Sequence, residues 1–207
     1  MKKLLSLFVV LTISFGLCSC AKQAKPEDTV KNFFEAVKAS DSEKMNTYVS
    51  QNSGSSLSSS ASTSSGEEKV EKELSNYFKD NMKKIAYNIK SSEINGNSAI
   101  VTVDCKYIDG SSIIKDTVTS YLAKIIAQAI TGANVNSSTA ENEFEETLSD
   151  KIKNTKETFI NKTIKINCVK TDNKWYISKI DDDLQNVLLS NFMSIKNDLS
   201  KLSEGIK

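Results

Sequence analysis

The sequence of 207 residues contains no histidine and no arginine. Without histidine, Ser-His and Cys-His nucleophile pairs and histidine metal sites are excluded. Without arginine, the bidentate clamp for phosphate or carboxylate groups is missing. Acid–base chemistry would fall to Asp, Glu, Lys, Tyr or Cys, and these residues nowhere show the spacing of a catalytic or metal site. We therefore expect no catalytic residue, no metal and no cofactor.

The first twenty residues have the composition of an export signal. Met1-Lys2-Lys3 is basic and residues 4–17 are almost wholly apolar, too short a run to span a bilayer, which takes roughly 20 residues. This pattern predicts a signal peptide over residues 1–19. Leu17-Cys18-Ser19-Cys20 resembles the bacterial lipobox, which implies cleavage between Ser19 and Cys20 and a diacylglyceryl group on Cys20. Two acyl chains anchor a protein stably, whereas one holds it only marginally.

The lipobox interpretation places the protein on the extracytoplasmic face of the cell membrane, held by lipid on Cys20. An ordinary signal peptide with a chance cysteine and an uncleaved anchor stay open as alternatives. Removing residues 1–19 leaves 188 residues with 25 lysines against 26 acidic residues. Such a near-neutral chain lacks the basic surface of a nucleic-acid-binding protein. The abundance of Lys, Asn, Ile and Ser is typical of an A+T-rich genome and favours a Gram-positive host.

The rest of the chain predicts a tether at residues 20–25 and one domain over residues 26–207. Pro26 suits the first position of a helix. Core residues then follow at helical spacing: Val30, Phe33, Phe34 and Val37. Ser40-Asp41-Ser42-Glu43 fits a capping box, so a second short helix is expected there. Residues 53–65 are mostly serine, and we expect a loop that buries no core.

Four later segments alternate between apolar and polar residues, which is typical of half-buried strands. They span residues 86–94, 98–108, 162–170 and 174–180. Asn95-Gly96-Asn97 joins the first two segments and Asp172-Asn173 the last two, and both are hairpin signals. Strands paired by hairpins form an antiparallel sheet, so the predicted class is α+β. Trp175 is expected in the core.

Helical patterns surround these strands, beginning with a Glu- and Lys-rich helix over about residues 67–85. Residues 111–160 predict an αα-hairpin inserted between the two strand pairs. Its expected apolar stripes are Ile114, Val118, Leu122, Ile125 and Ala129, then Phe144, Leu148, Ile152 and Phe159. The two stripes either face one another and the sheet, or flank an apolar cleft for a lipid, peptide or other hydrophobic ligand.

A closing helix is expected from Asp181-Asp182-Asp183 to about Ser203, with Asp182 and Gln185 as its capping box. The acidic run lacks the spacing of a calcium loop. Apolar residues in this helix form a heptad-like seam: Leu188, Phe192, Ile195, Leu199, Leu202 and Ile206. The seam either docks on the protein's own domain or binds a partner or a second copy of the chain.

Cys105 and Cys168 fall on the apolar faces of their strands. A pair of cysteines in an exported protein can form a disulfide when the two Cα atoms lie within about 7 Å. The alternative is two buried free thiols that pack as small hydrophobes. Both interpretations stay open.

Several segments together carry a resemblance to a known family. They are the lipobox, residues 26–38 (PEDTVKNFFEAVK), residues 98–103 (SAIVTV) and residues 174–177 (KWYI). They resemble uncharacterised lipoproteins of Gram-positive bacteria with a nuclear-transport-factor-two-like, or cystatin-like, domain. The resemblance implies helices packed into the concave face of a curved, cone-like antiparallel sheet. Enzymes of this fold place polar groups in the cone, and no such group can be carried over to this sequence.

The main hypothesis is a non-catalytic lipoprotein that binds a protein partner or a hydrophobic ligand outside the cytoplasmic membrane. One competing hypothesis is an enzyme that uses carboxylate or tyrosine chemistry in the cone. Another is a structural or stress protein of the cell envelope. We expect no nucleic-acid partner, and self-association would involve the closing helix.

Overall fold

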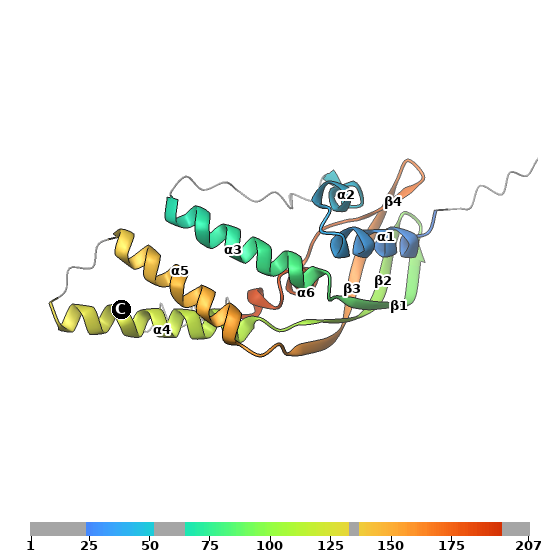
Figure 1. The fold of residues 1–207 in the computed structure, drawn as a ribbon. Coiled ribbons are helices and arrows are strands. Elements are labelled where there is room, and N and C mark those ends of the chain that lie inside the picture. The colour runs from blue at the N-terminus through green and yellow to red at the C-terminus, as the bar shows by residue number, and fades with distance from the viewer. Residues whose placement is uncertain (1–23, 52–64, 133–136, 196–207) are drawn as a thin grey trace, which may run out of the picture.

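The structure is a computed structural model, and it describes residues 24–51, 65–132 and 137–195. Its centre is a four-stranded antiparallel sheet in the order β1-β2-β3-β4 (Figure 1). The strands are β1 (Ala86–Asn95), β2 (Ser98–Ile108), β3 (Phe159–Thr171) and β4 (Lys174–Ile177). The sheet is open and helices pack on it, so the predicted α+β class is confirmed.

Several predicted features lie outside the described residues. They are the signal peptide at residues 1–19, the lipidation residue Cys20, nearly all of the Ser-rich segment 53–65, and the last part of the expected closing helix, residues 196–207.

Both predicted hairpin turns have the backbone that their residues favour. Gly96 has φ +60°, and Asp172 and Asn173 have φ +48° and +61°. The second turn has left-handed backbone at both central residues and the first at Gly96, which matches the twist of antiparallel strands; Asn, Asp and Gly adopt this backbone most readily. The turns fix the register of β1 against β2 and of β3 against β4. Strands β2 and β3, which the helical insertion separates in sequence, pair from Ser98 opposite Val169 to Ile108 opposite Phe159.

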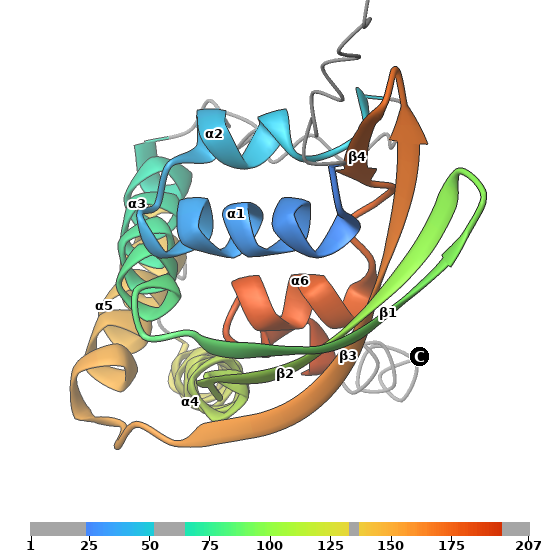
Figure 2. The same cartoon turned by 90° about the vertical axis from the view of Figure 1, so that its right-hand side faces the viewer.

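Helix α1 (Pro26–Lys38) lies in the concave face of the sheet, as Figure 2 shows. Pro26 opens it, and the acidic residues Glu27 and Asp28 in its first turn favour the positive end of the helix dipole. Its four predicted core residues are fully buried. The Thr29 hydroxyl donates a hydrogen bond to the Trp175 carbonyl oxygen at 3.1 Å, which ties α1 to β4.

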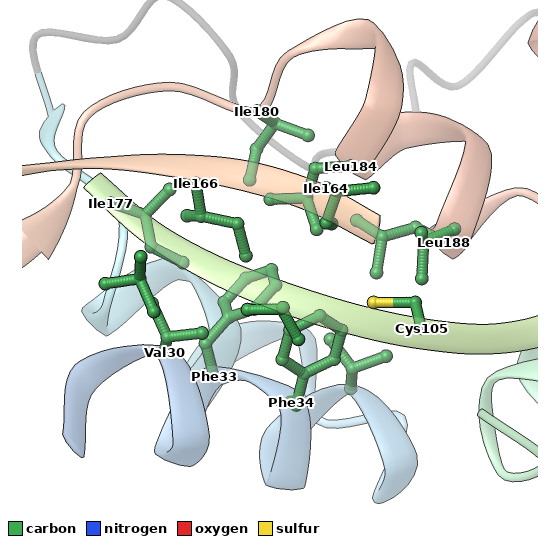
Figure 3. Packing of buried hydrophobic residues seen from close by; sticks show 14 of the residues in the cluster. Val30, Phe33, Phe34, Cys105, Ile164, Ile166, Ile177, Ile180, Leu184 and Leu188 are labelled. Carbon is green, nitrogen blue, oxygen red and sulfur yellow. The ribbon is translucent and has the colours of Figure 1, made fainter. Parts of the chain in front are cut away.

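Helix α6 (Asp182–Leu188) packs beside α1 on the same face and contacts β2 and β3. Figure 3 shows Phe33 and Phe34 of α1 and Leu184 and Leu188 of α6 around the strand that carries Cys105. These side chains are at most 2 % exposed. Burying one such side chain fully stabilises a fold by about 1.5–3 kcal/mol, so this contact contributes several kcal/mol to the stability of the domain.

Two helix caps differ from the expected ones by one residue. Helix α2 (Ser42–Thr47) is capped by Asp41, whose carboxylate accepts from the Lys44 amide at 2.9 Å, and not by Ser40. Helix α6 is capped by Asp181, which accepts from the Leu184 amide at 3.0 Å, and not by Asp182. In each case the capping oxygen reaches the amide three residues ahead.

The expectation of one continuous closing helix was wrong. Helix α6 ends at Leu188, and Ser190 and Asn191 adopt left-handed backbone with φ +52° and +63°. A 3₁₀ helix, η2 (Phe192–Ile195), follows. Leu188 and Ile195 are both buried in the protein's own domain, so this part of the seam docks in cis.

A helical extension projects from one end of the sheet (Figure 1). It consists of α3 (Ser65–Met82), α4 (Ser111–Ile130) and α5 (Ser137–Asn154). Helices α4 and α5 form the predicted αα-hairpin between β2 and β3, and α5 also contacts α3. The expected second helix stops before Phe159, because that residue begins β3.

The extension meets the sheet at Asp109 and Gly110, directly after β2. The Asp109 carboxylate accepts from the Ser111 hydroxyl at 2.6 Å and from the Asn191 side-chain amide at 3.0 Å. The Gly110 amide donates to the Ser190 carbonyl oxygen at 2.8 Å. This joint therefore connects β2, the start of α4 and the segment before η2.

Candidate functional site

The concave face of the sheet, where the resemblance implies a cone pocket, is filled with side chains. The buried cluster there contains aliphatic and aromatic residues from α1, α6 and the strands, together with Cys105 and Cys168. The Glu27 carboxylate lies near this cluster: it accepts from the Ser92 hydroxyl, and its charge adds to the effect of burial in raising the pKa of Cys168. The concave face is therefore mainly packed core.

The tyrosines at this face are held in the neutral form. Burial raises the pKa of Tyr107 to about 12. Burial also raises the pKa of Tyr87, and the Glu35 carboxylate adds to the shift because the Tyr87 hydroxyl donates to it at 2.6 Å. Tyr87 stacks on Phe34 with ring centroids 4.6 Å apart. A phenol whose pKa lies far above neutral pH is a poor proton donor, so these groups indicate packing.

The register keeps the two cysteines apart. Cys168 lies opposite Ala99 on β2, and Ala99 is six residues from Cys105 along the same strand. At about 3.3 Å per residue this places the two Cα atoms about 20 Å apart, far beyond the reach of a disulfide. Both thiols are free and buried, and burial raises the pKa of each to about 12. They pack as small hydrophobes, which is the second of the two interpretations left open by the sequence.

An open depression of about 460 Å³ lies over β1, β2 and β3 and is lined mainly by polar residues. Its acidic residue, Asp104, accepts from the Thr163 hydroxyl at 2.6 Å and forms an ion pair with Lys90 at 3.5 Å. The Thr163 hydrogen bond is the main cause that lowers the pKa of Asp104. Cross-strand polar pairs of this kind are ordinary on the solvated face of an antiparallel sheet.

Helix α4 is turned differently from the sequence expectation. Its buried residues are Ile113 and Thr117, whereas Leu122 of the expected inward stripe is 41 % exposed. One residue corresponds to about 100° of rotation around a helix, so a stripe displaced by one residue faces a different side. The predicted stripe is therefore right only in part: Ile114, Val118 and Ile125 are half-buried, whereas Leu122 and Ala129 are exposed.

Polar groups of α4 face its neighbour α5. The Lys124 ammonium donates to the Thr147 hydroxyl at 3.1 Å, and Gln128 donates to the Glu143 carboxylate. One aromatic contact accompanies them, an edge-to-face pair of Tyr121 and Phe144 at 5.4 Å. Lys124 is the one charged residue between positions 117 and 130, so the charges on the outer side of α4, Lys115 and Asp116, lie in the first half of the helix.

The outer side of α4 carries three large aliphatic side chains, Leu122, Ile126 and Ile130, which we call the α4 apolar surface. They are 41 %, 58 % and 81 % exposed, and a spacing of four places them along one side of the helix. They make up half of the exposed large hydrophobic residues in the described chain; the others are Ile94, Ile100 and Phe159 on the sheet. Clustered exposed apolar residues mark interaction surfaces, so this is the candidate functional site.

The sequence expectation omitted Ile126 and Ile130. A signal for them was present, because residues 121–130 are apolar apart from Lys124 and Gln128. That run contains more apolar residues than one side of a helix can bury, so some of them are expected on the exposed side.

Comparisons with known proteins identify no family. No family model matches the chain, and no curated protein matches it. A crystal structure of ycdA, a candidate lipoprotein from Bacillus subtilis strain 168, shows a TM-score of 0.41 and 17 % sequence identity. The match covers 82 % of this chain and 47 % of that chain, so this chain spans about half the length of ycdA. A likeness at this level establishes neither a shared family nor a shared function.

Proposed function

We propose that the chain is a lipid-anchored extracytoplasmic module that acts by binding, through the α4 apolar surface, and not by catalysis. The observation that carries this proposal is the surface itself, where three aliphatic residues face outward in the second half of a helix whose Lys124 and Gln128 contact α5. Contact with an apolar partner removes these side chains from water and is therefore favourable. Neither the enzyme hypothesis nor the envelope structural hypothesis has a comparable observation in its favour.

The lipobox supports the anchor. Cys20 lies six residues before Pro26, the first residue of α1, so the tether spans at most about 20 Å. A lipid on Cys20 would hold the domain close to the membrane surface. Within the described residues, no helix is both long and apolar enough to cross a membrane.

We also propose that α1 and the curved sheet are a variant of the nuclear-transport-factor-two-like domain.

The anchor is tested by fractionating host cells that express Cys20→Ala, with Cys18→Ala as the matched control. We expect Cys20→Ala to leave the membrane fraction, because it lacks the sulfur that accepts the lipid, and Cys18→Ala to stay there. Retention of Cys20→Ala in the membrane at the wild-type level would contradict the proposed anchor.

The surface is tested with a dye that fluoresces on apolar surfaces. We expect Ile126→Ser with Ile130→Ser to reduce dye binding strongly. Ile94→Ser is the matched control, since Ile94 is 56 % exposed but lies on the sheet. Equal loss in both proteins would show that dye binding does not report on α4.

A further inference from the structure

We propose that the partner of the α4 apolar surface is the lipid bilayer itself. Helix α4 lies in the plane of the membrane interface and makes a second contact beside the lipid on Cys20. This inference rests on the proposed function, because the lipid anchor is what brings α4 to a membrane. It names the occupant of the surface, which the proposed function leaves open.

The chemistry of the outer side favours hydrocarbon. Ala123, Ala127 and Ala129 are exposed beside Leu122, Ile126 and Ile130, while the exposed charged residues Lys115 and Asp116 lie in the first half of α4 and Lys124 turns toward α5. Thr119 also lies exposed on α4, and its hydroxyl donates to the Lys115 carbonyl oxygen at 2.8 Å. Unpaired polar groups are costly in hydrocarbon, and neither the three alanines nor Thr119 would bring one. Specific protein interfaces carry about one hydrogen bond per 100–200 Å². The α4 apolar surface offers few hydrogen-bond donors or acceptors and so fits such an interface less well than it fits hydrocarbon.

The size of the surface also favours a membrane over a protein. Helix α4 has 20 residues and is therefore about 30 Å long, and one helix face is about 10 Å wide. The available area is about 300 Å², whereas a stable protein interface buries about 800 Å² on each partner. A dimer of two copies that contact each other only through α4 would also bury too small an area on each copy. A bilayer needs no matched shape and accepts an amphipathic helix lying on it.

The position of α4 in the molecule fits two contacts with one membrane. Figure 1 shows α4 running along the long axis, away from the sheet, while α1 begins at the opposite end. The three aliphatic residues lie in the half of α4 that is farther from the sheet and extend to its last residue, so this half of the helix would insert. The lipid on Cys20 and the α4 apolar surface would then be two separate contacts with the membrane.

The expected strength follows from the exposed fractions. Together, the three side chains expose nearly the equivalent of two whole side chains. Their transfer from water to hydrocarbon corresponds to about a hundredfold in the partition coefficient. The charged residues of α4, Lys115, Asp116 and Lys124, leave it a net charge of only +1, so the contribution of the aliphatic residues should change little with salt, unlike binding by basic residues.

The test uses the mature chain, residues 20–207, with Cys20→Ala so that no lipid is attached. It is sedimented with vesicles of mixed phosphatidylcholine and phosphatidylglycerol. We expect binding that salt leaves nearly unchanged. The additional changes Leu122→Ser, Ile126→Ser and Ile130→Ser should lower the partition coefficient by about a hundredfold. The matched control adds Ile94→Ser and Ile100→Ser, which remove exposed isoleucines from the sheet, and it should bind as before. Equal melting temperatures show that each protein is folded.

Several outcomes would overturn the proposal. They include no vesicle binding by the parent chain, equal loss of binding in the control, and a parent that forms dimers which the α4 changes abolish. Binding that appears only after removal of residues 196–207 would show that the protein's own C-terminal segment occupies the surface. The anchor is tested separately by fractionating Cys20→Ala in the background of Leu122→Ser, Ile126→Ser and Ile130→Ser, where α4 no longer binds the bilayer. Failure of this inference is then distinguishable from failure of the proposed anchor.

Discussion

Adding a single methyl group at Gly110 tests the joint between the sheet and the helical extension. Gly110 has φ −94°, which other residues adopt readily, so the backbone alone does not require glycine. A Cβ atom there would lie 2.5 Å from both the Phe192 ring and the Tyr77 hydroxyl oxygen. The two rings stack on each other with centroids 5.5 Å apart, so neither can move without disturbing the other.

Overpacking of this kind costs about 1–3 kcal/mol, and two displaced rings place Gly110→Ala near the upper end. In a chain of this size, that loss lowers the melting temperature by roughly 4–10 °C. Urea unfolding followed by circular dichroism measures the free energy of unfolding. Gly132→Ala is the control, because Gly132 has open space around it and only its φ of +74° disfavours alanine, at about 1 kcal/mol.

A double-mutant cycle separates the clash from the change of helix-capping residue at Gly110. In a Phe192→Ala background, part of the obstruction is gone, so Gly110→Ala should cost at least about 1 kcal/mol less than in the wild type. The packing at this joint would be refuted if Gly110→Ala cost no more than Gly132→Ala and if Phe192→Ala left that cost unchanged.

Three further predictions concern caps, thiols and core. Asp181→Ala should lower the free energy of unfolding by about 1 kcal/mol, because α6 loses its capping acceptor, and Asp182→Ala by clearly less; equal effects in urea unfolding would contradict the observed cap. Iodoacetamide at pH 8 should label Cys105 and Cys168 only after unfolding, since burial raises both pKa values from 9.0 to about 12; labelling of the folded protein would contradict this. The unfolded thiols ionise near pH 9 while the folded ones stay protonated, so stability should fall as pH rises from about 9 to 12, and less steeply in a variant without Cys105. Phe34→Ala should cost about 3–5 kcal/mol in urea unfolding, because this ring is fully buried, and a loss below about 1 kcal/mol would place it outside the core.

Local patterns predicted the sheet and α1 well. Asn95-Gly96-Asn97 and Asp172-Asn173 favour turns through their own backbone preferences, and period-two alternation sets which strand face is buried. The buried face of β2 could therefore be predicted down to single residues, including Cys105. Helix α1 has one clear apolar side, so its sequence determines which side of the helix is buried.

Features set by tertiary contacts could not be predicted in the same way. Helix α4 is apolar on several sides, so its sequence leaves the rotation about its axis undetermined, and contacts of Lys124 and Gln128 with α5 decide it. The break after Leu188 has neither glycine nor proline to signal it, and the structure forms it where Ser190 accepts from the Gly110 amide. The distance between Cys105 and Cys168 required the register of β2 against β3, which the spacing of the two residues does not encode.

The central claim is that the chain is held at a membrane by lipid on Cys20. It is tested most directly by the mass of the N-terminal peptide of the protein extracted from host membranes. We predict a chain that begins at Cys20, whose sulfur carries a diacylglyceryl group. A chain that still contains residues 1–19, or one that begins at or near Cys20 with an unmodified thiol, would contradict the claim.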